Sequence, residues 1–198
     1  MDVNPAYAIA TQALESAMAA NLSERDGANL PERDKRRLEG TDTNGTFTYV
    51  YRGQVKDGVR EGLGVRIWSN GKKYEGVFKD GDYHGQGICR WPNGAIYQGS
   101  WDNGKMHGQG ILRLSGGAIY EGSWINGKKH GQGILIWPNG AIYQGSWEND
   151  KKHGQGILRL SGGAIYVGSF ENGKKNGSGK ITYPDGSEKI GTTIFSNV

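Results

Sequence analysis

Hydrophobic and polar residues alternate along most of the chain, with glycines at regular intervals. In IYQGSW, which begins at Ile96, the tyrosine, glycine and tryptophan fall on one face of an extended chain and the other residues on the opposite face. The next residues, 102–105, contain Asn-Gly, which supplies the two positive-φ residues of a type I′ hairpin turn. Residues 108–114 again alternate, so this stretch predicts an antiparallel β-hairpin. Ser-Gly-Gly or Pro-Asn-Gly then turns the chain into the next hairpin.

The same hairpin recurs six times with a constant period of 23 residues. Each repeat opens with a tyrosine, which is followed by a glycine two residues later and by a Val, Phe or Trp four residues later. The second strand of each repeat carries a pair of glycines two residues apart. Repeats 97–119 and 143–165 differ at only three positions, which indicates duplication of a 46-residue block. The repeats span 51–73, 74–96, 97–119, 120–142, 143–165 and 166–188.

Composition narrows the fold class. The chain has 35 glycines among 198 residues and is 35% hydrophobic, so a thick two-layer core is not expected. Pro is scarce and no Gly-X-Y period exists, which excludes a disordered Pro/Gly-rich chain and collagen. The pattern predicts an all-β protein, an elongated, twisted single-layer antiparallel β-meander solenoid over residues 46–198.

The repeats resemble those of the MORN (membrane occupation and recognition nexus) repeat family. The similarity lies in YxGxW…NGxxHGxG, seen here as YQGSWDNGKMHGQG and YEGSWINGKKHGQG, and covers roughly residues 51–188. The first repeat departs from the pattern at Val55 and Glu61, and the last at Asn176 and Lys180, as terminal capping repeats often do. The resemblance implies a non-enzymatic scaffold in a cytoskeletal or ciliary assembly, and the family name implies membrane recognition.

Two segments precede the repeats. Residues 1–22 are predicted to form a short α-helix, because Asn4 can cap it, Pro5 suits its first turn, and apolar residues recur at helical spacing. The sequence leaves open whether this helix lies against the repeats in cis, binds a partner or is a loosely ordered tail. Residues 23–45 are polar and charged and are interpreted as a linker.

The large Tyr and Trp rings need to be shielded from water, but a single sheet exposes both of its faces to solvent. A ring can lie over a glycine on its own face, and a sheet that curls around the rings would leave a groove. Such a groove suits an amphipathic helix or an extended peptide. An alternative is that the rings fill the curl completely. The residues predicted to line the groove are Tyr74, Trp91, Tyr97, Trp101, Tyr120, Trp124, Trp137, Tyr143, Trp147 and Tyr166.

Lysines near the hairpin turns suggest a second candidate surface. Residues 51–198 hold nineteen Lys or Arg against twelve Asp or Glu, a net charge of +7. A lysine row at one edge either resists strand-to-strand aggregation or binds anionic lipid headgroups, at about 1 kcal/mol per residue. Sparse arginine in the repeats argues against nucleic acid. Besides the pair Lys72–Lys73, the candidates are Lys105, Lys128, Lys129, Lys151, Lys152, Lys174 and Lys175.

Catalytic, metal and cofactor sites are not expected. The four histidines recur at one repeat position, so about 9–10 Å separates neighbours and they cannot share a metal. No nucleophile elbow or dinucleotide fingerprint occurs. Cys89 stands where other repeats have leucine and should pack in the core. A single cysteine fits a reducing compartment, and neither a secretory signal nor an apolar run of about 20 residues is present.

The sequence therefore favours a cytoplasmic, non-enzymatic scaffold that binds a partner helix or peptide in an aromatic-lined groove. A ciliary or cytoskeletal setting is implied by the resemblance alone. The alternative is a peripheral membrane adaptor that binds phosphoinositides through the turn lysines. Exposed end strands could also pair two copies in a homodimer.

Overall fold

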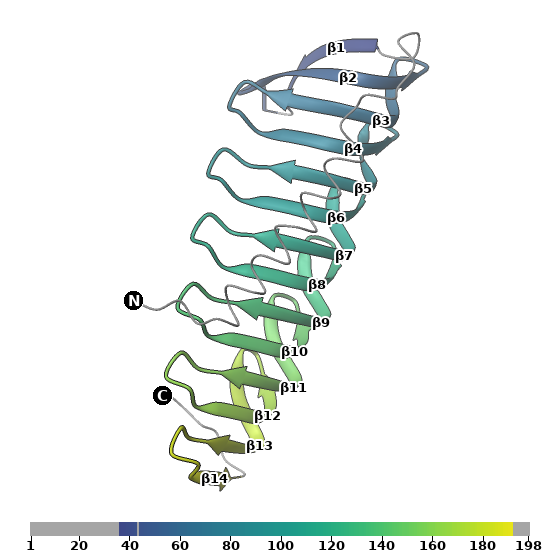
Figure 1. The fold of residues 1–198 in the computed structure, drawn as a ribbon. Helices are drawn as coiled ribbons and strands as arrows, with labels where there is room; N and C mark the ends of the chain where they lie inside the picture. Colours follow the sequence, from purple (N-terminus) through teal and green to yellow (C-terminus); the bar gives the residue numbers. More distant parts are fainter. Residues whose placement is uncertain (1–35, 43, 192–198) are drawn as a thin grey trace.

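The computed structural model describes residues 36–42 and 44–191, which form one antiparallel sheet of 14 strands in sequence order (Figure 1). No helix occurs among these residues, and the prediction of a helix at 1–22 lies outside them. The strands are β1 (Arg36–Thr41), β2 (Thr48–Lys56), β3 (Val59–Trp68), β4 (Lys73–Lys79), β5 (Asp82–Arg90), β6 (Ile96–Asp102), β7 (Lys105–Arg113), β8 (Ile119–Ile125), β9 (Lys128–Ile136), β10 (Ile142–Glu148), β11 (Lys151–Arg159), β12 (Ile165–Glu171), β13 (Lys174–Thr182) and β14 (Glu188–Gly191).

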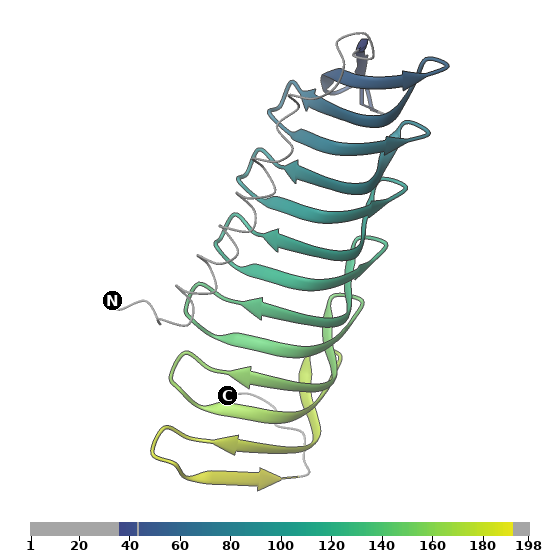
Figure 2. The same ribbon diagram turned by 45° about the vertical axis from the view of Figure 1, so that its right-hand side comes forward.

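The sheet is an elongated ribbon, as the single-layer meander prediction required (Figure 1). Turns within repeats lie along one long edge, and turns between repeats lie along the other (Figures 1 and 2). Each strand pairs only with its neighbours in sequence, so every strand pairing is local. Within the described residues, the fold class is confirmed.

The hairpin turns have the geometry that Asn-Gly predicts. Asn103 and Gly104 have φ values of 46° and 76°, and Asp102 pairs with Lys105 across the turn. Both central residues therefore lie in the left-handed region, as a type I′ turn requires.

A bulge bends the second strand of each repeat beside its hairpin turn. Between β6 and β7, Gly99 pairs with Gly110 but Trp101 pairs with Met106, so β7 contains extra residues in this interval. The first glycine of the pair, Gly108, has a φ of 60°, which an L side chain rarely adopts. Figure 2 shows the strands curving along their length, and a bulge of this kind produces such curvature.

The sheet begins earlier than the sequence indicated. Residues 36–41, assigned to the 23–45 linker, form β1 and pair with β2. The following turn has the hydrogen bonds of the later inter-repeat turns: Gly45 N donates to Asp42 O, as Gly94 N does to Trp91 O. This strand was missed because RRLEGT lacks the glycine pair and large apolar residues that mark the other second strands.

Candidate binding face

One side of the sheet, called the aromatic face here, carries the tyrosine that opens each repeat. The ring of Tyr97 lies flat over the glycines Gly99 and Gly110, which pair across β6 and β7. A Cβ atom added to Gly110 would come within 2.3 Å of Tyr97 Oη, and one on Gly99 within 2.7 Å. The tyrosine therefore fits only because both strands carry glycine at this point.

The polar atoms of these rings bond to the backbone of the sheet. The Tyr97 hydroxyl donates to the carbonyl oxygen of Ser100 at 3.0 Å, and Trp101 Nε1 donates to the carbonyl oxygen of Gly87 at 3.2 Å. The same bonds recur in the neighbouring repeats. Since buried polar groups need partners, these bonds let the rings lie fully inside the fold.

The rings form a continuous ladder of edge-to-face contacts along the sheet. The Tyr97 ring centroid lies 5.0 Å from that of Trp101 in its own repeat and 5.4 Å from that of Trp124 in the next. Both pairs are nearly perpendicular, a favoured arrangement of aromatic rings. The ladder runs from Tyr51 to Phe170 and ties each repeat to the next.

This packing seals most of the predicted groove. The tyrosines at 74, 97, 120, 143 and 166 are at most 1% exposed, and the tryptophans at 101, 124 and 147 at most 5%. Burial also raises the pKa of Tyr51 and of Tyr143 to about 12. These rings belong to the core of the sheet. This agrees with the alternative in which the rings fill the curl of the sheet completely. Of the ten predicted groove residues, only Trp91 and Trp137 are partly accessible.

The accessible apolar surface of this face lies near the inter-repeat turns. One large side chain per repeat occupies the same position there, and Leu114 and Tyr183 are 43% and 40% exposed. This set, called the apolar row below, consists of Trp68, Trp91, Leu114, Trp137, Leu160 and Tyr183. Trp68 is the exception in being buried, at 8% exposed.

The predicted lysine row splits between the two faces, because adjacent residues of a strand point to opposite sides. Three of the lysines are half-buried on the aromatic face, where Lys152 Nζ lies 5.6 Å from the Tyr143 ring centroid and 5.3 Å from that of Phe170. Burial lowers the pKa of Lys152, and of its equivalents in β9 and β13. The aromatic-face lysines are Lys129, Lys152 and Lys175; the exposed ones on the opposite face are Lys105, Lys128, Lys151 and Lys174.

Lys72 and Lys73 are not at the hairpin edge. They end the β3–β4 turn, which joins two repeats at the other edge of the sheet. Lys72 Nζ lies 4.8 Å from the Trp68 ring centroid, beside the apolar row. The prediction that this pair shares an edge with the other lysines is wrong, because the pair follows an inter-repeat turn.

The position of Lys152 is filled by a different large residue in several repeats. We call this set the cap row: Arg60, Tyr83, Met106, Lys129, Lys152 and Lys175. Its members lie close to the apolar row, since Lys152 Nζ is 5.9 Å from the Trp137 ring centroid and the rings of Tyr83 and Trp68 are 6.1 Å apart. The two rows together cover the tyrosine ladder and form a strip of the aromatic face that is accessible except at the buried Trp68 and Tyr83.

Comparison with protein families identifies the repeats. The MORN repeat model matches 51–73, 74–96, 97–119, 120–142, 143–165 and 166–188, which are the six repeats seen in the sequence and the structure. The chain belongs to the MORN repeat family. No match was found among curated proteins.

Two solved structures are similar in part to this MORN-repeat chain. One is the SAS-4 (dCPAP) TCP domain of Drosophila melanogaster in complex with a proline-rich motif of Ana2 (dSTIL), with 16% identity and a TM-score of 0.45 over 85% of this chain and 95% of that one. The other is a catalytically inactive virginiamycin B lyase from Staphylococcus aureus with quinupristin, with 14% identity and a TM-score of 0.20 over 83% of this chain and 58% of that one. At these scores the likeness gives no information about ligands or activity.

The histidines and the cysteine of the MORN repeats show no metal or nucleophile arrangement. Among the described residues, no group of three or more His, Cys, Asp or Glu side chains could hold a metal. His84 Nδ1 lies 3.4 Å from Asp102 Oδ1, whereas His107 Nδ1 is buried and has no hydrogen-bond partner. Cys89 is fully buried, as predicted, and burial raises the pKa of its thiol to about 11.

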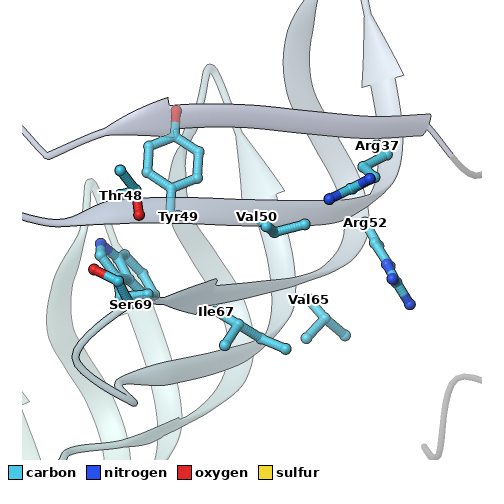
Figure 3. A pocket seen from close by; sticks show the side chains of 9 residues that line it. Arg37, Thr48, Tyr49, Val50, Arg52, Val65, Ile67 and Ser69 are labelled. Carbon is cyan, nitrogen blue, oxygen red and sulfur yellow. The ribbon is translucent and has the colours of Figure 1, made fainter.

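A small open cavity of about 360 Å³ lies at the β1 end of the sheet (Figure 3). Val50, Val65 and Ile67 line it, and the guanidinium groups of Arg37 and Arg52 stand beside them. Arg37 forms an ion pair with Glu39 at 2.6 Å, so part of its charge is already balanced. No motif or repeat position in the sequence indicated this site.

The part of the chain that the structure describes holds no helix that could span a membrane.

Proposed function

We propose that this MORN-repeat chain is a non-enzymatic scaffold that binds a partner protein along the strip of the aromatic face. The observation that carries the proposal is the apolar row, which places one large side chain at each repeat while Leu114 and Tyr183 stay 43% and 40% exposed. A helix or extended peptide lying along the sheet would contact these side chains in turn. Trp91 and Trp137 are the predicted groove residues that such a partner could reach.

The sealed ladder beneath the strip suits a binding role. Because the tyrosines already have their hydrogen bonds and ring contacts, the strip is held in place before any partner arrives. A preorganised surface loses less conformational entropy on binding, and this raises affinity for a given contact area. The bound partner would therefore add to a finished core rather than complete an open one.

A catalytic role has no support in the arrangement of side chains. The carboxylates of the repeats lie at turns or on the face away from the rings, and Cys89 is fully buried with the pKa of its thiol raised to about 11. The expectation of a cytoplasmic, cytoskeletal or ciliary setting, and that of end-strand pairing in a homodimer, remain predictions.

The binding proposal is tested by selecting peptides from a random displayed library on the immobilised full-length chain. Binding should be lost with the double variant Leu114→Gln, Tyr183→Gln, and kept with Leu63→Gln, Val167→Gln. The control residues are 48% and 45% exposed and lie on the opposite face. Thermal melts should show that all variants fold. Equal loss in both variants, or no loss in either, would refute the proposal.

Lipid binding by the turn lysines is the second candidate, but the structure favours it less. Lys105, Lys151 and Lys174 pair across their turns with Asp102, Glu148 and Glu171, which reduces the net charge at the exposed edge. Flotation with vesicles containing phosphoinositide tests it. Reversal of charge at Lys128 and Lys151 should abolish flotation if the edge binds lipid.

A further inference from the structure

Charged residues are segregated between the two faces of the sheet. Side chains alternate between the two faces along each strand, so the register of the described strands gives the face of every strand residue. By this rule no strand carboxylate lies on the aromatic face. The strand carboxylates on the opposite face are Glu39, Glu61, Glu75, Asp82, Asp102, Glu121, Glu148, Glu171 and Glu188. The strand cations on the aromatic face are Arg36, Arg60, Arg66, Lys129, Lys152, Lys175 and Lys189.

Some cations of the opposite face form ion pairs with carboxylates of the same face. Glu75 lies 2.9 Å from Lys73 and 3.1 Å from Arg90, and Glu188 lies 2.8 Å from Lys180. The pair with Lys73 lies within one strand, and the other two pairs join neighbouring strands. Lys73, Arg90 and Lys180 therefore already have carboxylate partners supplied by the sheet.

The cap-row lysines have no such partners. Among the described residues, Lys129, Lys152 and Lys175 form no ion pair with a carboxylate, and each ammonium lies instead within 6 Å of ring centroids. Asp150 of the next hairpin turn is the carboxylate whose charge acts on Lys129. A half-buried cation beside aromatic rings attracts an incoming anion more strongly than a solvated one, because less water screens it.

We propose that the strip is selective for an acidic polypeptide, with carboxylates facing the cap row and apolar side chains facing the apolar row. This rests on the proposed binding function and adds the chemistry of its partner. Cap-row lysines of neighbouring repeats are two strand spacings apart, or about 9–10 Å. Residues seven apart in a helix, or three apart in an extended chain, have nearly this separation, at about 10 Å. Carboxylates at that spacing can meet Lys129, Lys152 and Lys175 in turn.

The same geometry favours a polypeptide over a membrane. A lipid surface is broad and flat and binds lysines that project into solvent, whereas these ammonium groups lie low over the rings of Tyr120, Tyr143 and Tyr166. Beside them, the apolar row supplies a narrow second contact line. A slender chain with an acidic side and an apolar side matches both lines at once.

The test uses two synthetic helical peptides with an identical leucine stripe, which differ only in having Glu or Gln at three positions seven residues apart. We expect the full-length chain to bind the Glu peptide at least tenfold more tightly, as measured by fluorescence anisotropy. The triple variant Lys129→Met, Lys152→Met, Lys175→Met should remove most of this preference. Methionine is tolerated at this position, because Met106 occupies it in repeat 97–119.

A matched control keeps the change in total charge constant. The variant Lys128→Met, Lys151→Met, Lys174→Met removes the neighbouring lysines on the opposite face, so both variants change the net charge from +4 to +1. It should weaken binding of the Glu peptide by less than about threefold through long-range attraction. Equal weakening by both variants, or equal binding of the Glu and Gln peptides, would overturn the acidic selectivity.

The outcomes also separate this inference from the binding function. If both peptides bind equally and the Leu114→Gln, Tyr183→Gln variant releases both, the scaffold proposal stands and acidic selectivity is wrong. If that variant releases neither peptide, the proposed function fails and the selectivity fails with it. If anionic vesicles displace the Glu peptide from the wild-type chain and not from the Lys129, Lys152, Lys175 variant, the cap row binds lipid and the polypeptide proposal is wrong.

Discussion

Replacing Gly110 by alanine tests whether the fold depends on rings that lie directly on glycine. The added Cβ would stand 2.3 Å from Oη, 2.5 Å from Cζ and 2.6 Å from Cε2 of Tyr97. Gly110 has no positive φ, so alanine suits its backbone and the conflict is with the ring alone. Either the ring leaves its place or the two strands shift.

The expected cost follows from these two responses. A backbone shift of the kind seen in overpacked cores costs about 1–3 kcal/mol. Expelling the ring would expose on the order of 150–250 Å² that Tyr97 now buries, or about 4–6 kcal/mol at 25 cal/mol per Å². The Tyr97 bond to Ser100, worth about 1 kcal/mol, would also be lost. We expect destabilisation of about 2–5 kcal/mol.

Urea unfolding followed by tryptophan fluorescence measures this change. The control is Gly116→Ala, in an inter-repeat turn where an added Cβ meets nothing within 4 Å and φ is not in the left-handed region. That variant should stay within about 0.5 kcal/mol of wild type or be slightly stabilised. Combining Gly110→Ala with Tyr97→Leu should recover at least about 1 kcal/mol relative to additivity. Additive effects, or a Gly110→Ala variant as stable as the control, would show that the ring does not need the glycine.

Three further predictions concern other parts of the aromatic face and its turns. The pKa of Tyr51 and of Tyr143 is raised to about 12, so from pH 10 to 12 the unfolded chain loses protons that the folded chain keeps. Stability should fall over that range by up to about 2.7 kcal/mol per tyrosine, and absorbance at 295 nm should rise cooperatively with unfolding rather than gradually near pH 10. Alanine lacks the short polar side chain that lets asparagine adopt a φ of 46°, so Asn103→Ala should cost about 1–2 kcal/mol in urea unfolding, whereas Asn103→Gly should be nearly neutral. Cys89, fully buried with its thiol pKa raised to about 11, should react with a disulfide reagent only at the rate of unfolding, and rapid labelling in native buffer would contradict its place in the core.

The sequence predicted the fold because each feature of a repeat is local. A constant period, Asn-Gly turns and alternating side chains specify hairpins that pair in order, and the register of Asp102 with Lys105 follows from the turn alone. The bulge at Gly108 was not predicted, since nothing in the residue type distinguishes a glycine needed for positive φ from one needed for space. The strand at 36–41 was not predicted, because it lacks both the glycine pair and the large apolar residues that mark the second strand of each repeat.

The candidate site could be predicted less well. The tyrosines were correctly assigned to one face, but whether a ring is covered depends on the curvature of the strands, which the bulge sets and the sequence does not reveal. The division of the lysines was available from the sequence, because Lys128 and Lys129 are neighbours in a strand and must point to opposite faces. Lys128 and Lys129 therefore cannot belong to one row.

Within a repeat, the residues that recur without change and those that vary have separate tasks. Tyr97 and its equivalents are identical in all six repeats and are sealed against their glycines, so they provide the same rigid support at each step. The cap row changes from Arg60 through Tyr83 and Met106 to lysine, and all of these side chains except the buried Tyr83 lie at the accessible strip. A partner therefore meets a surface that differs from repeat to repeat on a support that does not. Its position and direction along the sheet would then be set by the order of the cap-row residues, because the identical support favours no register over another.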